Sequence, residues 1–274
     1  MNKTVLVTGV TGAIGKATAL ELAKENCRVI LLGRNAVKLS AVKSGIIRDS
    51  GNNDIEFFVA DLSEPGSVKQ AAQEIKKKYS SLNALINVAA IFKSKRIENS
   101  LGYEYMFATN HLGPFILTNE LTEMLKAGKS SKVITVSAPS FTKINFDDLH
   151  GKKKFSSGFT GAFGASKMMN LLFTYSLARR LGNTGITANV FHPGLVRSDL
   201  TKEMPAFLNF IFRQISGTPD KAARMLCRLA LDEKYATSNG TFFKFNGKEM
   251  KSNDYSHNQE MQDKLWKISE QLAG

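Results

Sequence analysis

Three glycines spaced three residues apart lie near the start of the 274-residue chain, at Gly9, Gly12 and Gly15. The apolar run at residues 5–7 before them predicts a buried strand, and the residues after them predict an amphipathic helix. A glycine-rich turn between a strand and a helix N-terminus directs backbone N–H groups and the positive end of the helix dipole at a pyrophosphate. This context favours dinucleotide binding over a plain flexible loop. The expected phosphate turn consists of Gly9, Thr11, Gly12, Ala13, Ile14 and Gly15.

A second signal concerns the choice between two dinucleotides. Residues 28–32 predict a strand, and Arg34 follows it directly after Gly33. Dinucleotide folds that select NAD usually place an acidic residue near this point to bind the ribose hydroxyls, whereas arginine suits a 2′-phosphate through a charge-assisted contact. Arg34 therefore favours NADP(H). The alternative is a solvated arginine at a strand end.

The composition limits the class of protein. Hydrophobic residues make up 43% of the chain, which suits one large α/β domain over residues 1–274. We expect no integral membrane segment, because no run of about 18 apolar residues occurs, and no signal peptide, because the first strand begins at once. Cys27 and Cys227 are too few for a disulfide framework and fit a reduced, cytoplasmic setting. No His, Cys and Asp cluster has metal-ligand spacing, so no metal site is expected.

The formal net charge of +13 leaves nucleic acid or an anionic membrane surface as possible partners. However, the lysines are scattered, apart from short runs at residues 76–78 and 152–154, and no basic stripe interleaved with aromatic residues occurs. This distribution favours solvated faces plus one anionic cofactor over a polyanionic partner, so we expect no nucleic-acid partner.

Strand-like and helix-like segments alternate along the chain with little interruption. Such alternation indicates βαβ units, and therefore a doubly wound, Rossmann-type parallel sheet of about seven strands with helices on both faces. The expected strands are residues 5–7, 28–32, 55–60, 84–87, 132–137, 186–191 and 241–245. The expected helices after the first are residues 36–48, 65–79, 98–109, 112–125 and 163–181.

Residues 204–212 break this alternation with a dense apolar stretch after the sixth strand. Ligands of open α/β sheets bind outside the carboxyl ends of the strands, so a segment there can cover a substrate. We therefore expect a substrate lid around residues 200–216. The alternative is a helix packed on the core or on a partner subunit.

Together these features resemble the short-chain dehydrogenase/reductase family over nearly the whole chain. Within it, the sequence is most similar to the branch of retinol dehydrogenases and WW-domain oxidoreductases. The stretches that carry this likeness are residues 110–115, 146–149, 166–174, 177–181, 192–194 and 264–270.

The resemblance implies roles at both ends of the cofactor. Asp61 and Leu62 would lie at the adenine, and Asn87 and Ala89 would line the adenosine ribose. The nicotinamide end would be held by Pro193, Gly194, Val196 and Ser198. Asn110 would kink a helix and support a water that links to Lys167. Lys167 would bind the nicotinamide ribose and, in an ordinary member, lower the pKa of the catalytic tyrosine.

Two departures from the family pattern fall on the catalytic pair. The Tyr-x-x-x-Lys motif appears with Phe163 before Lys167, so the phenol is missing. The serine expected at the end of the fifth strand appears as Ala138, with Ser137 one residue early. Adjacent strand side chains point to opposite faces, so Ser137 cannot simply replace it. Loss of a positioned acid typically costs ~10²–10⁴-fold in rate, and loss of an oxyanion donor ~10²–10³-fold.

Two smaller departures concern the cofactor side. The family usually carries its second glycine where this chain has Ala13, and the usual Asn-Asn-Ala-Gly after the fourth strand reads Asn-Val-Ala-Ala at residues 87–90. Both should alter local geometry without abolishing phosphate binding.

Four interpretations fit these residues. The first is an NADP(H)-dependent oxidoreductase that transfers hydride to or from an activated alkene, an iminium or a carbonyl protonated by water or Lys167. The second is a catalytically silent NADP-binding scaffold or sensor. The others are a variant engineered at residues 138 or 163 to trap a complex, and a non-redox reaction in the same pocket. Family membership favours the first.

The substrate and assembly are less directly encoded. Phe141, Phe155, Phe159, Phe163 and the 204–212 stretch favour an apolar small molecule. The resemblance implies a homo-oligomer, with the helices at residues 112–125 and 163–181 as the expected contact surface.

Overall fold

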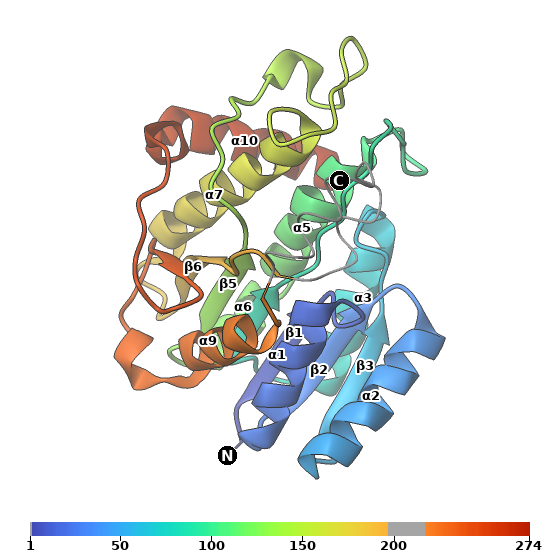
Figure 1. Cartoon of the computed structure of the whole chain (residues 1–274), viewed down its shortest axis with the longest axis vertical. Coiled ribbons are helices and arrows are strands. Elements are labelled where there is room, and N and C mark those ends of the chain that lie inside the picture. Colours follow the sequence, from blue (N-terminus) through green and yellow to red (C-terminus); the bar gives the residue numbers. More distant parts are fainter. Residues whose placement is uncertain (1, 197–216) are drawn as a thin grey trace.

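Seven parallel strands form one sheet in the order β3-β2-β1-β4-β5-β6-β7. The computed structural model describes residues 2–196 and 217–274 (Figure 1). The strands are β1 (Thr4–Thr8), β2 (Arg28–Gly33), β3 (Ile55–Val59), β4 (Ala84–Asn87), β5 (Lys132–Val136), β6 (Thr187–His192) and β7 (Phe242–Lys244). Each predicted strand is confirmed to within one or two residues. Buried parallel strands read as continuous apolar runs, which is why they were visible in the sequence.

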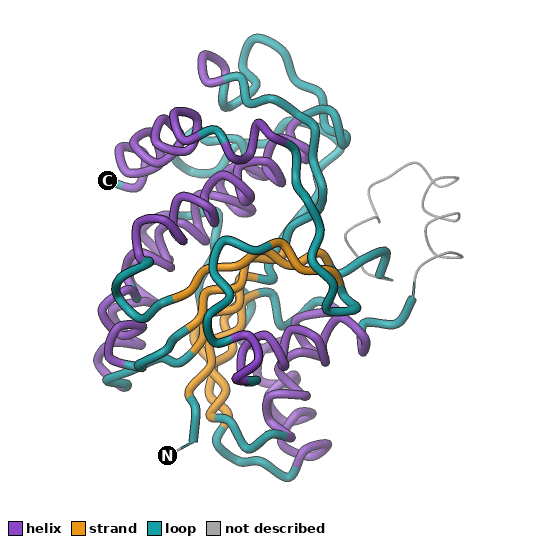
Figure 2. Tube along the Cα trace, turned by 90° about the vertical axis from the view of Figure 1, so that its left-hand side faces the viewer, coloured by secondary structure: helices purple, strands orange, loops and turns teal. Residues whose placement is uncertain are grey.

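Helices cover both faces of this sheet, as Figure 2 shows with the strands between two groups of helices. The side chains of each strand alternate between two cores: Leu6 and Ile30 face one core, and Val5 and Val29 face the other. The first core includes α3 (Pro65–Lys78), α5 (Gly113–Glu120), α6 (Thr122–Ala127), α7 (Ala162–Leu181) and α10 (Gln259–Ala273). The second includes α1 (Ala13–Lys24), α2 (Ala36–Ser50) and α9 (Asp220–Leu231). The doubly wound α/β fold is therefore confirmed.

The strand order reverses next to β1, and this reversal fixes where a ligand can bind. The chain runs from β1 outward through β2 to β3, and then crosses to β4 on the other side of β1. The helices that follow β1 and β4 leave on opposite faces of the sheet. Doubly wound sheets bind their ligands at such a switch point, outside the carboxyl ends of the strands.

The helix predicted over residues 98–109 is wrong for its first half. Residues 98 and 104 form an antiparallel bridge, Gly102 has φ +76°, and Asn99 Oδ1 accepts from the backbone N–H of Leu101 and of Tyr103. α4 is Tyr105–Phe107, and it begins at Tyr105 because the Glu104 carboxylate caps its first N–H groups. A π-helical turn, Ala108–Leu112, then leads into α5.

Three further expectations concern the helix at 112–125, the contact surface for a second copy and the substrate lid. The helix expected at 112–125 is divided into α5 and α6 at Leu121. The expected contact surface for a second copy is partly covered by α10, whose Trp266 packs on Phe115 of α5 and Phe173 of α7. Pairing of copies through these helices stays a prediction. The expected lid at 200–216 lies outside the described residues.

The described residues offer neither a membrane-spanning helix nor a cluster of metal ligands. Within residues 2–196 and 217–274, no helix has both the length and the apolar character needed to cross a bilayer. The same residues contain no group of three or more His, Cys, Asp or Glu side chains that could hold a metal ion.

Candidate functional site

The phosphate turn closes tightly on itself at the carboxyl end of β1. Gly9 has φ +69°, and a Cβ there would lie 2.7 Å from Cα of Ala89. A Cβ on Gly15 would lie 2.4 Å from the carbonyl oxygen of Gly9. The backbone N–H of Gly12 donates to that same carbonyl at 3.0 Å. Glycine is therefore required at both ends of the turn, while Ala13 is accommodated as the first residue of α1.

The N-terminus of α1 is left open to an anion. Its N-cap, Gly12, makes no side-chain hydrogen bond, and the first turn contains no acidic residue. By contrast, α2 and α10 are capped by asparagines, Asn35 and Asn258, which accept backbone N–H groups. The first-turn N–H groups of α1, including those of Ala13 and Ile14, thus have no competing side-chain cap in front of a pyrophosphate.

The residues expected at the ribose lie beside this turn. The Thr8 hydroxyl accepts from the backbone N–H of Val88 at 3.0 Å and of Ala89 at 3.1 Å, which fixes the end of β4 against the end of β1. Asn87 is buried, and its amide nitrogen donates to the Thr118 hydroxyl at 3.2 Å. Its carbonyl oxygen has no partner among the described residues. A buried acceptor left unpaired at the switch point is suited to a donor on a ligand.

The adenosine end is bounded by the ends of β2 and β3. One Asp61 carboxylate oxygen accepts from the backbone N–H and the hydroxyl of Ser63, at 2.9 and 2.7 Å. The carbonyl of Leu62 lies so close to Gly113 that a Cβ there would stand 2.2 Å from it, which brings α5 against this end. Arg34 is exposed, and its guanidinium donates to the hydroxyl of Tyr105 at 2.9 Å.

The expected nicotinamide-end residues follow β6. Pro193 and Gly194, which has φ +75°, form the turn after the strand. Val196 forms a parallel bridge with Gly217. Ser198 lies outside the described residues, so its expected role stays a prediction.

Lys167 is the one lysine of α7 and is buried at 6% exposure. Burial lowers the pKa of its ammonium to about 8. Among the residues described, no carboxylate lies within ion-pair distance of Nζ; its neighbour is the ring of Phe163, 5.2 Å away at the centroid. The fold therefore keeps a desolvated cation at the place where the family pattern has its catalytic lysine.

Phe163 lies one helical turn before Lys167, inside an aromatic cluster. Its ring packs edge to face on Phe92 at 5.7 Å and on Phe159 at 5.4 Å, and Met106 completes the contact. Only 3% of the side chain is exposed. The position that carries a phenol in ordinary members is thus apolar.

The hydroxyl of Ser137 is used within the fold. It donates to the backbone carbonyl of Lys167 at 3.0 Å, so it ties β5 to α7. Ala138 follows and is half-buried. Ser137 therefore stabilises the position of the lysine, and residue 138 has no hydroxyl to offer a substrate.

Asn110 joins the loop after β4 to α7. Its side chain accepts from the backbone N–H of Ile91 at 2.8 Å and donates to the carbonyl of Ile91 at 3.0 Å and to the hydroxyl of Ser166 at 3.1 Å. It lies in the π-helical turn, where the helix departs from regular geometry. Its expected link through water to Lys167 stays a prediction.

With this geometry in hand, comparison with known proteins identifies the family. The family model described as short chain dehydrogenase matches residues 3–209. The chain belongs to the short-chain dehydrogenase/reductase family. It is 34% identical over 276 residues to retinol dehydrogenase 12 of Mus musculus, covering 99% of this chain and 86% of that protein. It therefore falls in the retinol-dehydrogenase-like branch.

Solved structures agree with this assignment. A protein of uncharacterised function from Mycobacterium paratuberculosis is 29% identical, with a TM-score of 0.78 over 99% of this chain and 93% of that one. A short-chain dehydrogenase from Shigella flexneri, solved with NADP, has 24% identity and a TM-score of 0.71, covering 89% of this chain and 98% of that one. The second likeness concerns the fold alone.

Within this family member, the other tyrosines that could supply a phenol are engaged elsewhere. Tyr103 donates to the carbonyl of Leu272 at 3.3 Å, and the Tyr175 hydroxyl pairs with that of Ser252 at 2.8 Å. Tyr105 pairs with Arg34 at the adenosine end. His192 is partly buried, with Nδ1 unpartnered among the described residues, and its pKa is lowered by burial.

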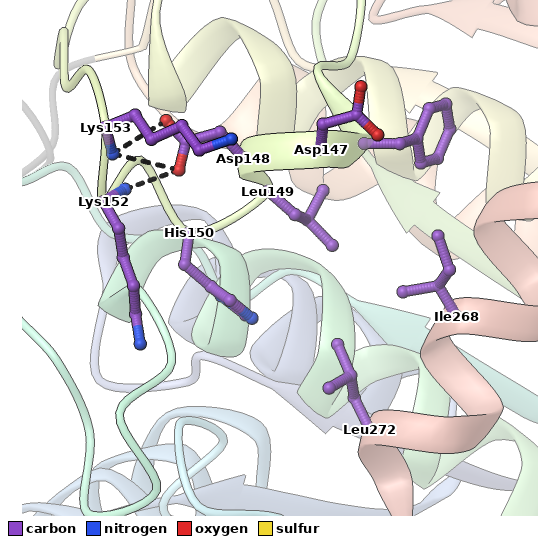
Figure 3. A pocket seen from close by; sticks show the side chains of 9 residues that line it. Asp147, Asp148, Leu149, His150, Lys152, Lys153, Ile268 and Leu272 are labelled. Carbon is purple, nitrogen blue, oxygen red and sulfur yellow. Dashed lines mark hydrogen bonds between the residues drawn. The ribbon is translucent and has the colours of Figure 1, made fainter.

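Two cavities lie to one side of these residues, along the loop between β5 and α7. One of about 250 Å³ is lined by Phe155, Ala162, Ala165 and Met169 among others. The other, of about 340 Å³, lies between the loop around Asp148 and the C-terminal turns of α10 (Figure 3). Of the expected substrate-lining phenylalanines, Phe155 reaches the first cavity, whereas 80% of Phe141 is exposed.

Sequence reasoning missed two residues of the site. Phe92 packs edge to face on Phe163, and the Tyr105 hydroxyl accepts a hydrogen bond from Arg34. Neither belongs to a spacing pattern, and Tyr105 is 71 residues from its partner. Only the tertiary fold brings these pairs together.

Proposed function

We propose that this chain binds NADP(H) and transfers hydride between it and an apolar small molecule without a phenol or serine at the reacting oxygen. The phosphate turn, the open N-terminus of α1 and Arg34 support the cofactor assignment. The observation that carries the catalytic part is Lys167, a buried cation with no carboxylate partner in the described chain. Burying an unpaired charge destabilises a fold, so a purely structural position would favour an apolar residue.

The bound nicotinamide would supply or accept the hydride, and Lys167 would hold its ribose. The acceptor must then require little help from a hydroxyl donor. An iminium becomes a neutral amine on hydride addition and needs no proton. An activated alkene or a carbonyl becomes an anion, and the ammonium of Lys167 is the proton donor that the site offers.

The pKa of Lys167 suits this role. A general acid works best when its pKa is near the operating pH. With a pKa of about 8, Lys167 is mostly protonated at neutral pH and loses its proton readily. Any reaction that depends on this proton should slow as the pH rises above about 8.

The apolar substrate class is supported by two features. The side chains around Phe163 are aromatic or apolar, with Phe92, Phe159 and Met106 in contact. Two relatives are named for apolar alcohols, retinol dehydrogenase 12 and polyprenol dehydrogenase. A weakly polar acceptor fits both.

A second candidate is an NADP-binding protein that performs no reaction. Its specific support is the buried Phe163 cluster together with Ser137, whose hydroxyl is committed to the backbone of α7. This candidate predicts cofactor binding without turnover.

Single-turnover kinetics separate the two candidates. The full chain is mixed with NADPH and an excess of a cyclic enone, and the loss of nicotinamide absorbance is followed from pH 6 to pH 10. Hydride transfer that declines above about pH 8, and that Lys167→Met abolishes at unchanged protein folding, supports the oxidoreductase. Tight NADPH binding with no transfer to enones or iminium ions supports the silent binder instead.

A further inference from the structure

Arg34 and Tyr105 come from segments far apart in the chain and meet at the adenosine end. Arg34 follows β2, and its Nη1 donates to the Tyr105 hydroxyl at 2.9 Å across 71 residues. The phenol oxygen acts there as acceptor. No described residue accepts the phenol hydrogen, so the hydroxyl retains a donor of its own.

Hydrogen bonds hold the backbone around Tyr105 in place. Its backbone N–H donates to the carbonyl of Ile97 at 2.9 Å, and the preceding Glu104 carboxylate caps the helix that it begins. Glu104 is buried at 2% exposure, so this cap is shielded from water. The phenol is therefore a half-buried, positioned group, while the guanidinium that it holds is exposed.

We propose that Tyr105 is the second half of the 2′-phosphate subsite and sets the preference for NADP(H) over NAD(H). The phenol oxygen orients the Arg34 guanidinium, and the phenol hydrogen donates to a phosphate oxygen alongside it. The ligand class is a phosphate monoester on the ribose of an adenine nucleotide. This inference rests on the proposed use of NADP(H).

The energetics favour a role in recognition over one in stability. A hydrogen bond to an exposed arginine adds little to the folded state, because water competes for both groups. A free arginine, however, loses side-chain entropy when it is ordered. Holding Arg34 in place before the ligand arrives removes part of that cost from binding.

Equilibrium titrations of the full chain test the proposal. NADPH and NADH are titrated against the unmodified chain, Tyr105→Phe, Arg34→Ala and the double variant. Tyr103→Phe is the matched control, because it loses a phenol hydroxyl two residues away whose one hydrogen bond among the described residues is to the Leu272 carbonyl. Thermal unfolding without nucleotide is measured for each.

We expect Tyr105→Phe to weaken NADPH binding about 3- to 10-fold and to leave NADH binding and the unfolding temperature unchanged. In the Arg34→Ala background the same change should have less than about a 2-fold effect, because the two residues act on one phosphate. Tyr103→Phe should not change the ratio of the two affinities.

Two outcomes would overturn the inference while leaving the proposed function intact. Equal weakening of NADPH and NADH would make Tyr105 a wall of the adenine site, and unchanged or tighter NADPH binding would make it dispensable or obstructive. If the unmodified chain binds neither nucleotide, the proposed function itself fails.

Discussion

The two ends of the candidate site are built from opposite chemistry. The adenosine and phosphate end is polar: it has an uncapped helix N-terminus, an exposed arginine held by a phenol, and a carboxylate at the end of β3. The reaction end is apolar, with Phe163 buried among Phe92, Phe159 and Met106 around one desolvated ammonium. In our proposal the first end holds the dinucleotide, and the second has Phe163 and Ala138 where the family resemblance implies a phenol and a serine.

This contrast teaches that holding the cofactor and donating a proton are separate tasks in this fold. The phosphate turn depends on backbone geometry after β1, whereas proton donation depends on two side chains at the end of β5 and the start of α7. Changing residues 138 and 163 therefore leaves the phosphate turn untouched.

Restoring the two hydroxyls should have the largest effect. The double change Phe163→Tyr with Ala138→Ser places a phenol beside Lys167 and a hydroxyl where the family resemblance implies the catalytic serine, so the reduction of unactivated ketones should rise ~10²–10⁴-fold. NADPH affinity should stay within about 3-fold, since Lys167 and the phosphate turn are unchanged. Steady-state assays with a ketone panel measure both. A double variant that folds and binds NADPH yet stays inert would show that the two hydroxyls alone do not restore ketone reduction.

Adding a side chain inside the phosphate turn should weaken cofactor binding at the adenosine and phosphate end. Gly15→Ala puts a Cβ 2.4 Å from the carbonyl of Gly9, so the turn must open and NADPH affinity should fall roughly 10- to 100-fold. Gly66→Ala is the control, because no described residue beyond its chain neighbours and the backbone of α3 comes within 4 Å of its Cβ position. Fluorescence titration and circular dichroism give affinity and folding. NADPH binding by Gly15→Ala at the unmodified affinity would argue against this turn as the phosphate site.

Replacing the buried cation should stabilise the nucleotide-free protein. Burial lowers the pKa of Lys167 from 10.5 to about 8, and a tenfold change in proton affinity corresponds to about 1.4 kcal/mol. The unfolded chain therefore binds more protons between these pH values, so the penalty is full below about pH 8 and disappears as the pH rises toward 10.5. Lys167→Met should raise the free energy of unfolding on the order of 3 kcal/mol at pH 7, and progressively less above pH 8.

Urea titrations at pH 7 and at pH 10 check this sign. An increase in the free energy of unfolding of Lys167→Met that is the same at both pH values would point to better packing alone. A loss of stability at pH 7 would mean that the ammonium has a compensating partner.

Removing the hydroxyl of Ser137 should have the smallest effect. Ser137→Ala loses the bond to the carbonyl of Lys167 and should cost about 1 kcal/mol of stability. Hydride transfer should change little, because this hydroxyl acts within the fold. Ser44→Ala, an exposed serine of α2, is the control. A large loss of transfer at unchanged stability would make Ser137 a substrate contact.

Much of the framework of this site was predictable from sequence, and the reasons are local. Parallel strands buried on both faces leave apolar runs, and the glycines mark a turn whose clashes arise within a few residues of chain.

What escaped prediction depends on contacts across the fold. The stretch at 98–104 is a turn and not a helix because Asn99 and Glu104 bond nearby backbone N–H groups, a competition that apolar spacing does not reveal. The Arg34–Tyr105 pair and the Phe92–Phe163 contact join distant segments. The pKa of Lys167 depends on its burial, which only the packed fold determines.

The most direct test of the central claim compares two acceptors with one carbon skeleton, a cyclic iminium ion and the corresponding ketone. Single-turnover rates of NADPH oxidation are measured with the unmodified chain at pH 7. We expect the iminium, which needs no proton, to be reduced at least about 10²-fold faster than the ketone relative to their uncatalysed reactivity. Rapid reduction of the ketone by the unmodified chain would contradict the central claim, because that rate would show that a group of this site protonates the oxygen as well as the absent phenol and serine would.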